Sequence, residues 1–282
     1  MNLKQYLAKA KEEKWAIGQF NFSTLDQLKG TLAALSELKS PAILGTSEGE
    51  SKFFGLEEAV ALCKVFQKKY DLPVFLNLDH GRDLDYVKKT IDSGYDAVHF
   101  DGSSLELGEN IKETKTVAGW AKRKGIAVEG EIGTIKGESS VHKEKIEVSA
   151  SDLAGVNDVA EFVKKTGVDT IAVAVGTTHG IYANEQGINF ERLEEISKAV
   201  NLPLVLHGGS GVLEADIKKA ISLGIAKINF NTEIRQVWKE SLAKALADSE
   251  DFKPYKILPQ VIDAIKEKVK EKIFILGSAN RA

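Results

Sequence analysis

The feature that most constrains the fold is an alternation of short apolar runs with longer segments of helical period. Eight apolar runs occur in the chain, at 16–22, 41–47, 73–80, 97–102, 126–131, 170–176, 203–209 and 226–231. The segments between them are charged and repeat apolar residues at intervals of three and four, as in EEAVALCKVFQKKY and FERLEEISKAV, which is typical of amphipathic helices. Strands that alternate with helices in this way form parallel sheets, because each helix carries the chain back to the start of the next strand.

Glycine ends several of the helical segments, in DSGYDAVHF, RKGIAVEG, KTGVDTIAV and SLGIAKINF. It suits the left-handed residue that closes a helix. Eight strand–helix units without a Pro/Ser-rich linker predict an α/β protein with a single domain over 1–282, a (β/α)8 TIM barrel. Within it we expect a mobile active-site loop at 134–152 and a C-terminal helical extension at 240–282.

The alternative architecture is an open, doubly wound sheet. Such a sheet normally carries a nucleotide-binding fingerprint near its first strand, and GQFNFSTLDQLKG is not one. The pattern therefore favours the barrel.

Composition excludes several classes of protein. The net charge of −3 argues against nucleic acid or an acidic membrane as the main partner. The one cysteine, Cys63, cannot form an internal disulfide and fits a reducing compartment. The N-terminal segment lacks the apolar core of a signal peptide, and no apolar run approaches the ~20 residues that span a bilayer. We expect a cytoplasmic protein.

Polar residues gather where the predicted strands end. In a barrel of this type, chemistry collects at the carboxyl ends of the strands. The polar residues at or just after these ends are Asn21, Ser47, Asp79, His80, Asp101, Glu129, Glu131, His179, His207, Asn229 and Asn231.

Three of the five histidines, His80, His179 and His207, belong to this set. A lone strand-end histidine is more often structural, but three neutral imidazoles that converge around an open fourth position are the ligands of a catalytic Zn²⁺. Of the others, His99 lies within the fourth run, where a structural role is expected, and His142 lies in the polar loop.

Three carboxylates near the same ends allow two interpretations. Asp101, Glu129 and Glu131 could accept imidazole N–H groups or hold a second divalent ion. Alternatively, they are rim carboxylates paired with lysines such as Lys227.

An anion site is predicted beside the histidines. HGGSG (207–211) follows the seventh run and NFNTE (229–233) the eighth. Glycines let backbone N–H groups approach an oxyanion, and Ser210 and Thr232 add hydroxyl donors at helix N-termini. Together with the carboxylate of Asp79, a metal and a phosphate pocket indicate chemistry on a phosphorylated carbonyl compound.

The segments NLDHG, VEGEIGT, AVAVGTTHGIY, PLVLHGGSG and KINFNTE, in this order and spacing, resemble the class II, metal-dependent ketose-bisphosphate aldolases, which include the fructose- and tagatose-bisphosphate enzymes. The resemblance extends from AIGQFNF to ILGSANRA. It implies reversible aldol cleavage of a ketose 1,6-bisphosphate to dihydroxyacetone phosphate and glyceraldehyde 3-phosphate. It also implies a homodimer or homotetramer.

The resemblance further implies roles for individual residues. The zinc ligands match His80, His179 and His207, and Asp79 matches the catalytic acid/base that takes the C4 hydroxyl proton. Asp101 and Glu131 match a second or alternate metal position, and Na⁺ or K⁺ commonly binds near the phosphate. The residues that match the substrate site, together with the strand-end Asn21 and Ser47, are Gly180, Gly208, Gly209, Ser210, Asn229 (the active-site asparagine), Phe230, Asn231 and Thr232.

Two segments depart from the family pattern. Many relatives have Gly-x-Glu-Asp in the loop after the fifth strand, whereas GESSVH places Glu138 one position early and Ser139 at the glutamate position. We expect Glu138 to act there, with Glu144 and His142 as alternatives.

The second departure concerns the far end of the substrate. Relatives carry a Pro-Arg whose arginine binds the distal phosphate, but here Pro254 is followed by Tyr255. That phosphate would fall to Lys253, Lys256 or Arg281, or the substrate is a ketose 1-phosphate with a different far end.

Two further hypotheses remain open on the sequence. A Schiff-base aldolase would need a lysine inside the barrel mouth, and Lys227 is the lysine within a predicted strand. A non-catalytic sugar-phosphate-binding barrel would not need the carboxylate of Asp79.

Overall fold

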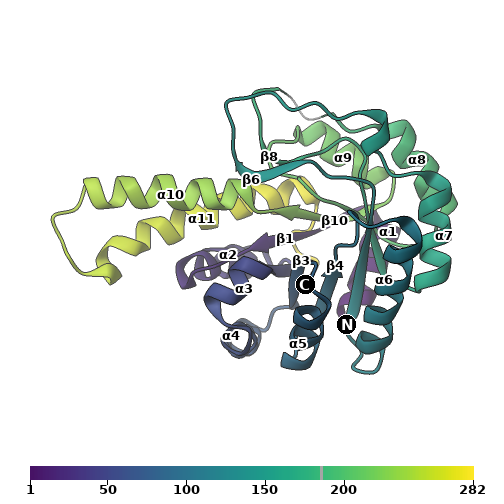
Figure 1. Ribbon diagram of the computed structural model, residues 1–282. Coiled ribbons are helices and arrows are strands. Elements are labelled where there is room, and N and C mark those ends of the chain that lie inside the picture. Colours follow the sequence, from purple (N-terminus) through teal and green to yellow (C-terminus); the bar gives the residue numbers. More distant parts are fainter. Residues whose placement is uncertain (185–186) are drawn as a thin grey trace.

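The computed structural model describes residues 1–184 and 187–282. Within these residues, eight parallel strands close a barrel in the order β1-β10-β9-β7-β5-β4-β3-β2. Each predicted apolar run coincides with one strand to within a few residues, so the TIM barrel is confirmed and the open sheet is wrong (Figure 1). The barrel strands are β1 (Ile17–Asn21), β2 (Ala42–Ser47), β3 (Val74–Gly81), β4 (Ala97–Phe100), β5 (Ala127–Ile132), β7 (Thr170–Val173), β9 (Leu204–Leu206) and β10 (Ile225–Phe230).

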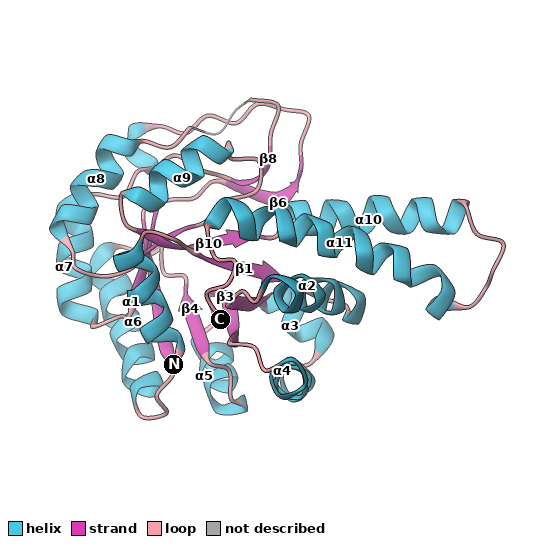
Figure 2. Cartoon of the chain, turned by 180° about the vertical axis from the view of Figure 1, so that it is seen from behind, coloured by secondary structure: helices cyan, strands magenta, loops and turns pink. Residues whose placement is uncertain are grey.

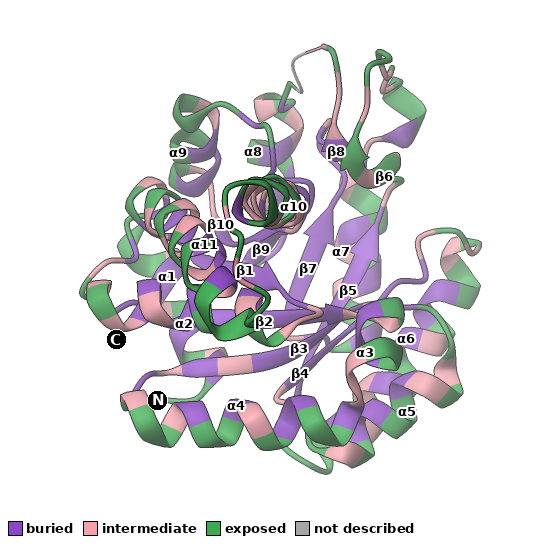
Figure 3. Ribbon diagram, turned by 90° about the vertical axis from the view of Figure 1, so that its left-hand side faces the viewer, coloured by how far each residue is buried: buried purple, intermediate pink, exposed green. Residues whose placement is uncertain are grey.

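Helices follow the strands and cover the outside of the barrel with one apolar face each. In α7 (Val156–Thr166) the buried residues include Val159 and Phe162, and the helix ends at Gly167, whose φ is +70°. Figure 3 shows the same division, with buried strands inside and exposed outer helix faces. The remaining helices that follow barrel strands are α2 (Leu25–Leu38), α3 (Glu48–Phe54), α4 (Leu56–Tyr70), α5 (Leu84–Ser93), α6 (Leu107–Lys122), α8 (Phe190–Ala199) and α9 (Glu214–Ser222).

The N-terminal helix α1 (Leu3–Glu13) closes one end of the barrel. Its buried Leu7 and Ala10 belong to an apolar cluster with Ile17, Ile43 and Ala226, which lie at the starts of their strands. The amino ends of the strands are thereby covered, and the carboxyl ends are left for a cavity.

Two long helices form a hairpin that projects from the barrel (Figures 1 and 2). They are α10 (Thr232–Ala247) and α11 (Pro254–Leu276), so the segment 240–282 contains the end of α10 and all of α11. The side chains of Phe252 and Tyr255 at the hairpin tip are 95% and 71% exposed. No helix in the described part of the chain is long and apolar enough to cross a membrane.

The loop at 134–152 contains structure that the sequence does not predict. Its strand β6 (Gly137–Val141) pairs in parallel with β8 (His179–Ile181), and a short 3-10 helix follows at Ala150–Asp152. The base of the loop is closed where the Thr134 N–H donates to the Asp152 carbonyl, at 2.8 Å. The mobility of the 134–152 loop remains a prediction.

Candidate functional site

A cavity of about 380 Å³ opens at the carboxyl ends of the strands. Most residues predicted for the site line it, and the lining residues come from six barrel strands or the segments that follow them. The lining residues are Ser47, Glu48, Gly49, Asp79, His80, Arg82, Gly137, Ser139, His179, Gly180, His207, Gly208, Ser210, Asn229, Asn231, Thr232 and Arg235.

Asp79 and His80 both line the cavity although they are adjacent in β3. In a regular strand, neighbouring side chains point to opposite faces. The strand is irregular here, because its register against β4 shifts between Leu78 and Gly81 and His80 has φ +52°. This break in strand geometry allows one cavity to receive both side chains.

The Asp79 carboxylate is buried and held by two amides. It accepts hydrogen bonds from Asn21 Nδ2 at 2.9 Å and from Asn229 Nδ2 at 3.0 Å. Burial acts to raise the pKa of Asp79, but the charges of His80, His207 and Lys227 keep it well below its usual range. Asp79 is therefore a carboxylate at neutral pH and can accept a proton.

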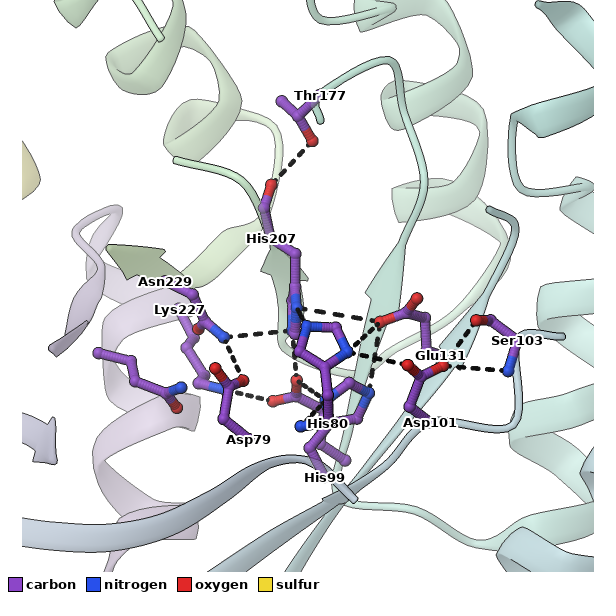
Figure 4. Close-up of polar contacts among 12 residues, drawn as sticks. Asp79, His80, His99, Asp101, Ser103, Glu131, Thr177, His207, Lys227 and Asn229 are labelled. Carbon is purple, nitrogen blue, oxygen red and sulfur yellow. Dashed lines mark hydrogen bonds and ion pairs between the residues drawn. The ribbon is translucent and has the colours of Figure 1, made fainter. Parts of the chain in front are cut away.

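The imidazoles of His80, His179 and His207 meet beside Asp79, and Figure 4 shows His80 and His207 among them. His80 Nε2 lies 2.8 Å from His207 Nδ1, and the His179 ring centroid lies 4.7 Å from that of His80 and 6.0 Å from that of His207. His179 Nε2 is buried and has no hydrogen-bond partner among the described residues. Burial, followed by the charge of His80, lowers the pKa of both His179 and His207, which favours the neutral form that binds metals. Burial also acts to lower the pKa of His80, but the charge of Asp79 and the hydrogen bond with Asp101 raise it to about 9, so a metal bound here would displace a proton from His80.

In His80 and His207, the second ring nitrogen contacts a carboxylate. His80 Nδ1 lies 3.0 Å from Asp101 Oδ2, and His207 Nε2 lies 2.8 Å from Glu129 Oε1. Carboxylates commonly orient metal-binding histidines in this way. The donor set and the unpartnered His179 nitrogen therefore fit a Zn²⁺ ion bound by His80, His179 and His207.

The groups of possible ligand atoms within 4.8 Å of one another do not include His179. In the described residues they are Asp79 with His80, His99 and His207, and His80 with Asp101 and Glu131. The second group corresponds to the predicted alternate metal position.

Glu129 fits both interpretations of the strand-end carboxylates, because it contacts a histidine and a lysine at once. Its Oε1 faces His207, and its Oε2 accepts a hydrogen bond from Lys227 Nζ at 2.6 Å. Lys227 is buried and does not line the cavity, and no lysine is found among the described lining residues. The Schiff-base alternative therefore lacks its nucleophile.

Most residues of the predicted anion pocket line the same cavity as the histidines. Gly208 adopts φ +65° and Gly180 φ +103°, while α10 begins at Thr232. Ser210 and Asn231 complete this part of the wall. Backbone N–H groups at a helix start and beside glycines form a site for an oxyanion.

Three residues predicted to bind substrate do not line the cavity. Asn21 lies beneath it and bonds to Asp79. The Gly209 N–H donates to the Asn229 carbonyl at 3.1 Å, and the Phe230 ring stacks on Phe20 with centroids 5.9 Å apart. The side chain of Phe230 is thus part of the core.

Glu138 also lies outside the cavity lining. It is exposed, whereas the next residue, Ser139, lines the cavity and lies 2.9 Å from Thr232 Oγ1 through its hydroxyl. Of the alternatives, the His142 ring stacks on Tyr182, and Glu144 is likewise absent from the lining. A proton-transfer role for Glu138 remains a prediction that requires the loop to shift.

Two arginines in the lining were not predicted. Arg82 binds Asp101 Oδ2 through Nε at 2.9 Å and Nη2 at 2.8 Å, and Arg235 donates to Glu50 Oε1 at 2.6 Å. The signals existed in the sequence, because Arg82 follows His80 by two positions and Arg235 lies one helical turn after Thr232.

A family model described as class II fructose-bisphosphate aldolase matches residues 1–281. The chain belongs to this family. It is a class II aldolase, a carbon–carbon lyase, as the sequence predicts.

Individual relatives cover the whole aldolase chain. The sulfofructosephosphate aldolase of Alkalicoccus urumqiensis is 40% identical, over 99% of this chain and 97% of the relative. The probable fructose-bisphosphate aldolase of Bacillus subtilis strain 168 is 38% identical, over 100% and 99%. The crystal structure of the YdjI aldolase from Escherichia coli K12 superposes with a TM-score of 0.86 at 31% identity, over 100% of this chain and 98% of that chain.

The cations predicted to bind a distal phosphate lie elsewhere in this aldolase. Arg281 pairs with Glu13 at 2.7 Å, at the end of the helix that closes the opposite end of the barrel. Lys253 and Lys256 lie near Asp251, at 3.8 and 3.1 Å, beside the hairpin tip. None of the three lines the cavity of its own chain.

Proposed function

We propose that this aldolase cleaves a ketose 1,6-bisphosphate of the fructose or tagatose type to dihydroxyacetone phosphate and glyceraldehyde 3-phosphate. The observation that carries the proposal is the irregular end of β3, from which Asp79 and His80, the proposed base and a proposed zinc ligand, enter one cavity. The anion pocket in the same wall supports a phosphorylated substrate.

The proposed cofactor is one Zn²⁺ held by His80, His179 and His207. When bound, it would supply Lewis acidity at the substrate carbonyl. We also propose that Asp101 and Glu131 offer a position for a second divalent ion, and that Na⁺ or K⁺ binds near the phosphate. A homodimer or homotetramer in the cytoplasm completes the proposal.

The chain's own residues would orient the sugar and move its proton. The C1 phosphate would lie against the backbone of Gly208, the hydroxyls of Ser210 and Thr232, and the start of α10. Asp79 would take the proton of the C4 hydroxyl as the C3–C4 bond breaks, while Asn229 fixes the carboxylate at 3.0 Å.

A second candidate differs at the far end of the substrate. One relative at 40% identity is named a sulfofructosephosphate aldolase, and Tyr255 stands where the family arginine is expected. The cations among the described lining residues are Arg82 and Arg235. The side chain of Arg82 is 70% exposed and its Nη1 donates to no described residue, so it could bind a distal phosphate or sulfonate.

A cleavage screen tests both candidates. Wild type is assayed on fructose and tagatose 1,6-bisphosphates, on their 1-phosphates, and on 6-deoxy-6-sulfofructose 1-phosphate, before and after zinc removal. We expect a substrate with a distal anion to give the highest kcat/KM. Activity that survives complete metal removal, or cleavage of none of these compounds, would contradict the proposal.

The variant Arg82→Gln tests the far-end contact in the same assay. It is expected to lower kcat/KM for the preferred substrate by about tenfold or more, the worth of one charge-assisted contact, and to change the 1-phosphate little. An equal fall on both compounds would show that Arg82 acts through Asp101 instead.

A further inference from the structure

The break in β3 leaves one more residue on this strand than on its neighbour. Leu78 is paired with Val98 and Gly81 with Phe100, so Asp79 and His80 together face the single residue His99 of β4. Two residues opposite one define a β-bulge, a feature that bends a strand and redirects a side chain.

The bulged residue is His80, and its backbone is in an uncommon conformation. Its φ of +52° lies in the left-handed region, which costs free energy for a residue with a β-carbon. Its N–H is also turned away from the regular ladder and needs another acceptor. A side chain supplies this acceptor, because the His80 N–H donates to His99 Nδ1 at 3.2 Å.

His99 is placed to hold this conformation rigidly. It is fully buried, and its ring centroid lies 4.6 Å from that of His80 and 4.8 Å from that of His207. The resumed pairing beyond the bulge includes the Asp101 N–H, which donates to the Gly81 carbonyl at 2.9 Å. The bulge is therefore fixed by its flanking pairs and, at its centre, by His99.

The hydrogen bond also fixes the tautomer of His99. A nitrogen that accepts an N–H carries no proton, so the proton of the neutral ring lies on Nε2. That nitrogen is 3.3 Å from Glu131 Oε2, and neither atom has a hydrogen-bond partner among the described residues. A protonated Nε2 cannot bind a metal, so His99 is not a further ligand despite its place in the cluster.

We propose that His99 is a positioning residue: its Nδ1 holds the bulge at His80, and the bulge directs Asp79 and His80 into the same cavity. The proposal rests on the proposed zinc site, because its effect is exerted on a zinc ligand. His99 itself touches neither metal nor substrate.

Three substitutions of His99 distinguish the contact made by its Nδ1 from the contact made by its Nε2. His99→Asn places a carbonyl oxygen near the position of Nδ1 and keeps the acceptor for His80. His99→Gln can reach Glu131 but loses that acceptor, and His99→Leu loses both contacts. Zinc affinity is measured by competition with a chelator, and the visible spectrum of the cobalt-substituted protein reports the geometry of the ligands.

We expect His99→Gln and His99→Leu to bind zinc about 10- to 100-fold more weakly, as is typical when the partner of a metal-ligand residue is removed. His99→Asn should stay within about threefold of wild type, within the worth of a single altered contact. The cobalt spectrum should change in the first two variants and persist in the third. Equal losses in all three variants, or no loss in any, would overturn the proposal.

Nitrogen-15 NMR of histidine-labelled wild-type protein gives an independent test that requires neither metal nor activity. We expect an unprotonated Nδ1 and a protonated Nε2 for His99, and the opposite tautomer would overturn the proposal even if a variant failed to fold. Wild type that binds no zinc while His99 shows the expected tautomer would refute the zinc site and leave the bulge contact intact.

Discussion

Replacing Lys227 with methionine tests how the buried carboxylate beside His207 is held. The side chains of Lys227 and Glu129 are 2% and 5% exposed, and their charged atoms lie 2.6 Å apart. Burial acts to raise the pKa of Glu129, and the charge of Lys227 is the largest influence that lowers it, with the net result well below the usual value. Methionine fills a similar volume but leaves the carboxylate without its counter-charge.

Breaking a buried pair by removing one partner costs about 3–5 kcal/mol, because an uncompensated charge remains. We therefore expect Lys227→Met to lower the free energy of unfolding by about this amount in urea titrations at pH 7. The folded-state pKa of Glu129 is depressed, so its contribution is present above the unfolded value of about 4.3 and is lost as the pH falls. The difference between variant and wild type should accordingly narrow on acidification.

Two comparisons make this prediction specific. Lys198→Met removes an exposed helix partner of Glu194, and should cost no more than about 0.5 kcal/mol. Adding Glu129→Gln to Lys227→Met removes both charges and keeps an acceptor for His207, so part of the lost stability should return. A cost for Lys227→Met as small as that of Lys198→Met, or no recovery in the double variant, would refute the reasoning.

Three further changes have defined outcomes. Burial and the charge of Asp96 raise the pKa of Cys63 to about 12, so iodoacetamide at pH 8 should modify the thiol only after unfolding; modification of the folded protein would contradict this. Hydrogen bonds from Lys136 and Ser149 lower the pKa of Asp152 to about 2, so it should stabilise the base of the 134–152 loop above about pH 4 and less as the pH falls towards 2. Asp152→Asn should therefore speed proteolysis within the loop at neutral pH, and an unchanged rate would count against this. Gly208 has φ +65°, and Gly208→Ala would put a β-carbon 2.2 Å from the backbone oxygen of Thr178. The substitution should weaken dihydroxyacetone phosphate binding, measured by calorimetry, by about tenfold or more. Unaltered affinity would show that this loop is not the anion site.

The barrel could be predicted because its signals are local. Each strand is a buried apolar run, and glycines such as Gly94 and Gly167 close the preceding helices with positive φ. The strands β6 and β8 could not be predicted, since GESSV and HGI are short, polar and glycine-containing and are paired only by the fold.

Part of the candidate site could likewise be predicted from the sequence, and part could not. Asp79, His80 and His207 could be placed at one end of the barrel because parallel strands share that end. Since adjacent strand residues point to opposite faces, a break in strand geometry between Leu78 and Gly81 could be expected from the sequence. Its form, a bulge, could not be predicted, because it depends on how many residues of β4 lie opposite β3. Ion pairs between residues far apart in the sequence also could not be predicted, as in the pair of Arg281 with Glu13.

The most direct test of the central claim is the rate of bond cleavage by Asp79→Asn with its metal content verified. The substitution keeps the shape of the side chain and removes the proton acceptor. We predict that kcat/KM for the best substrate of the screen falls by about 10²- to 10⁴-fold, the usual range for a lost general base, while zinc content stays at the wild-type level. A zinc-loaded Asp79→Asn protein that cleaves as fast as wild type would contradict the account.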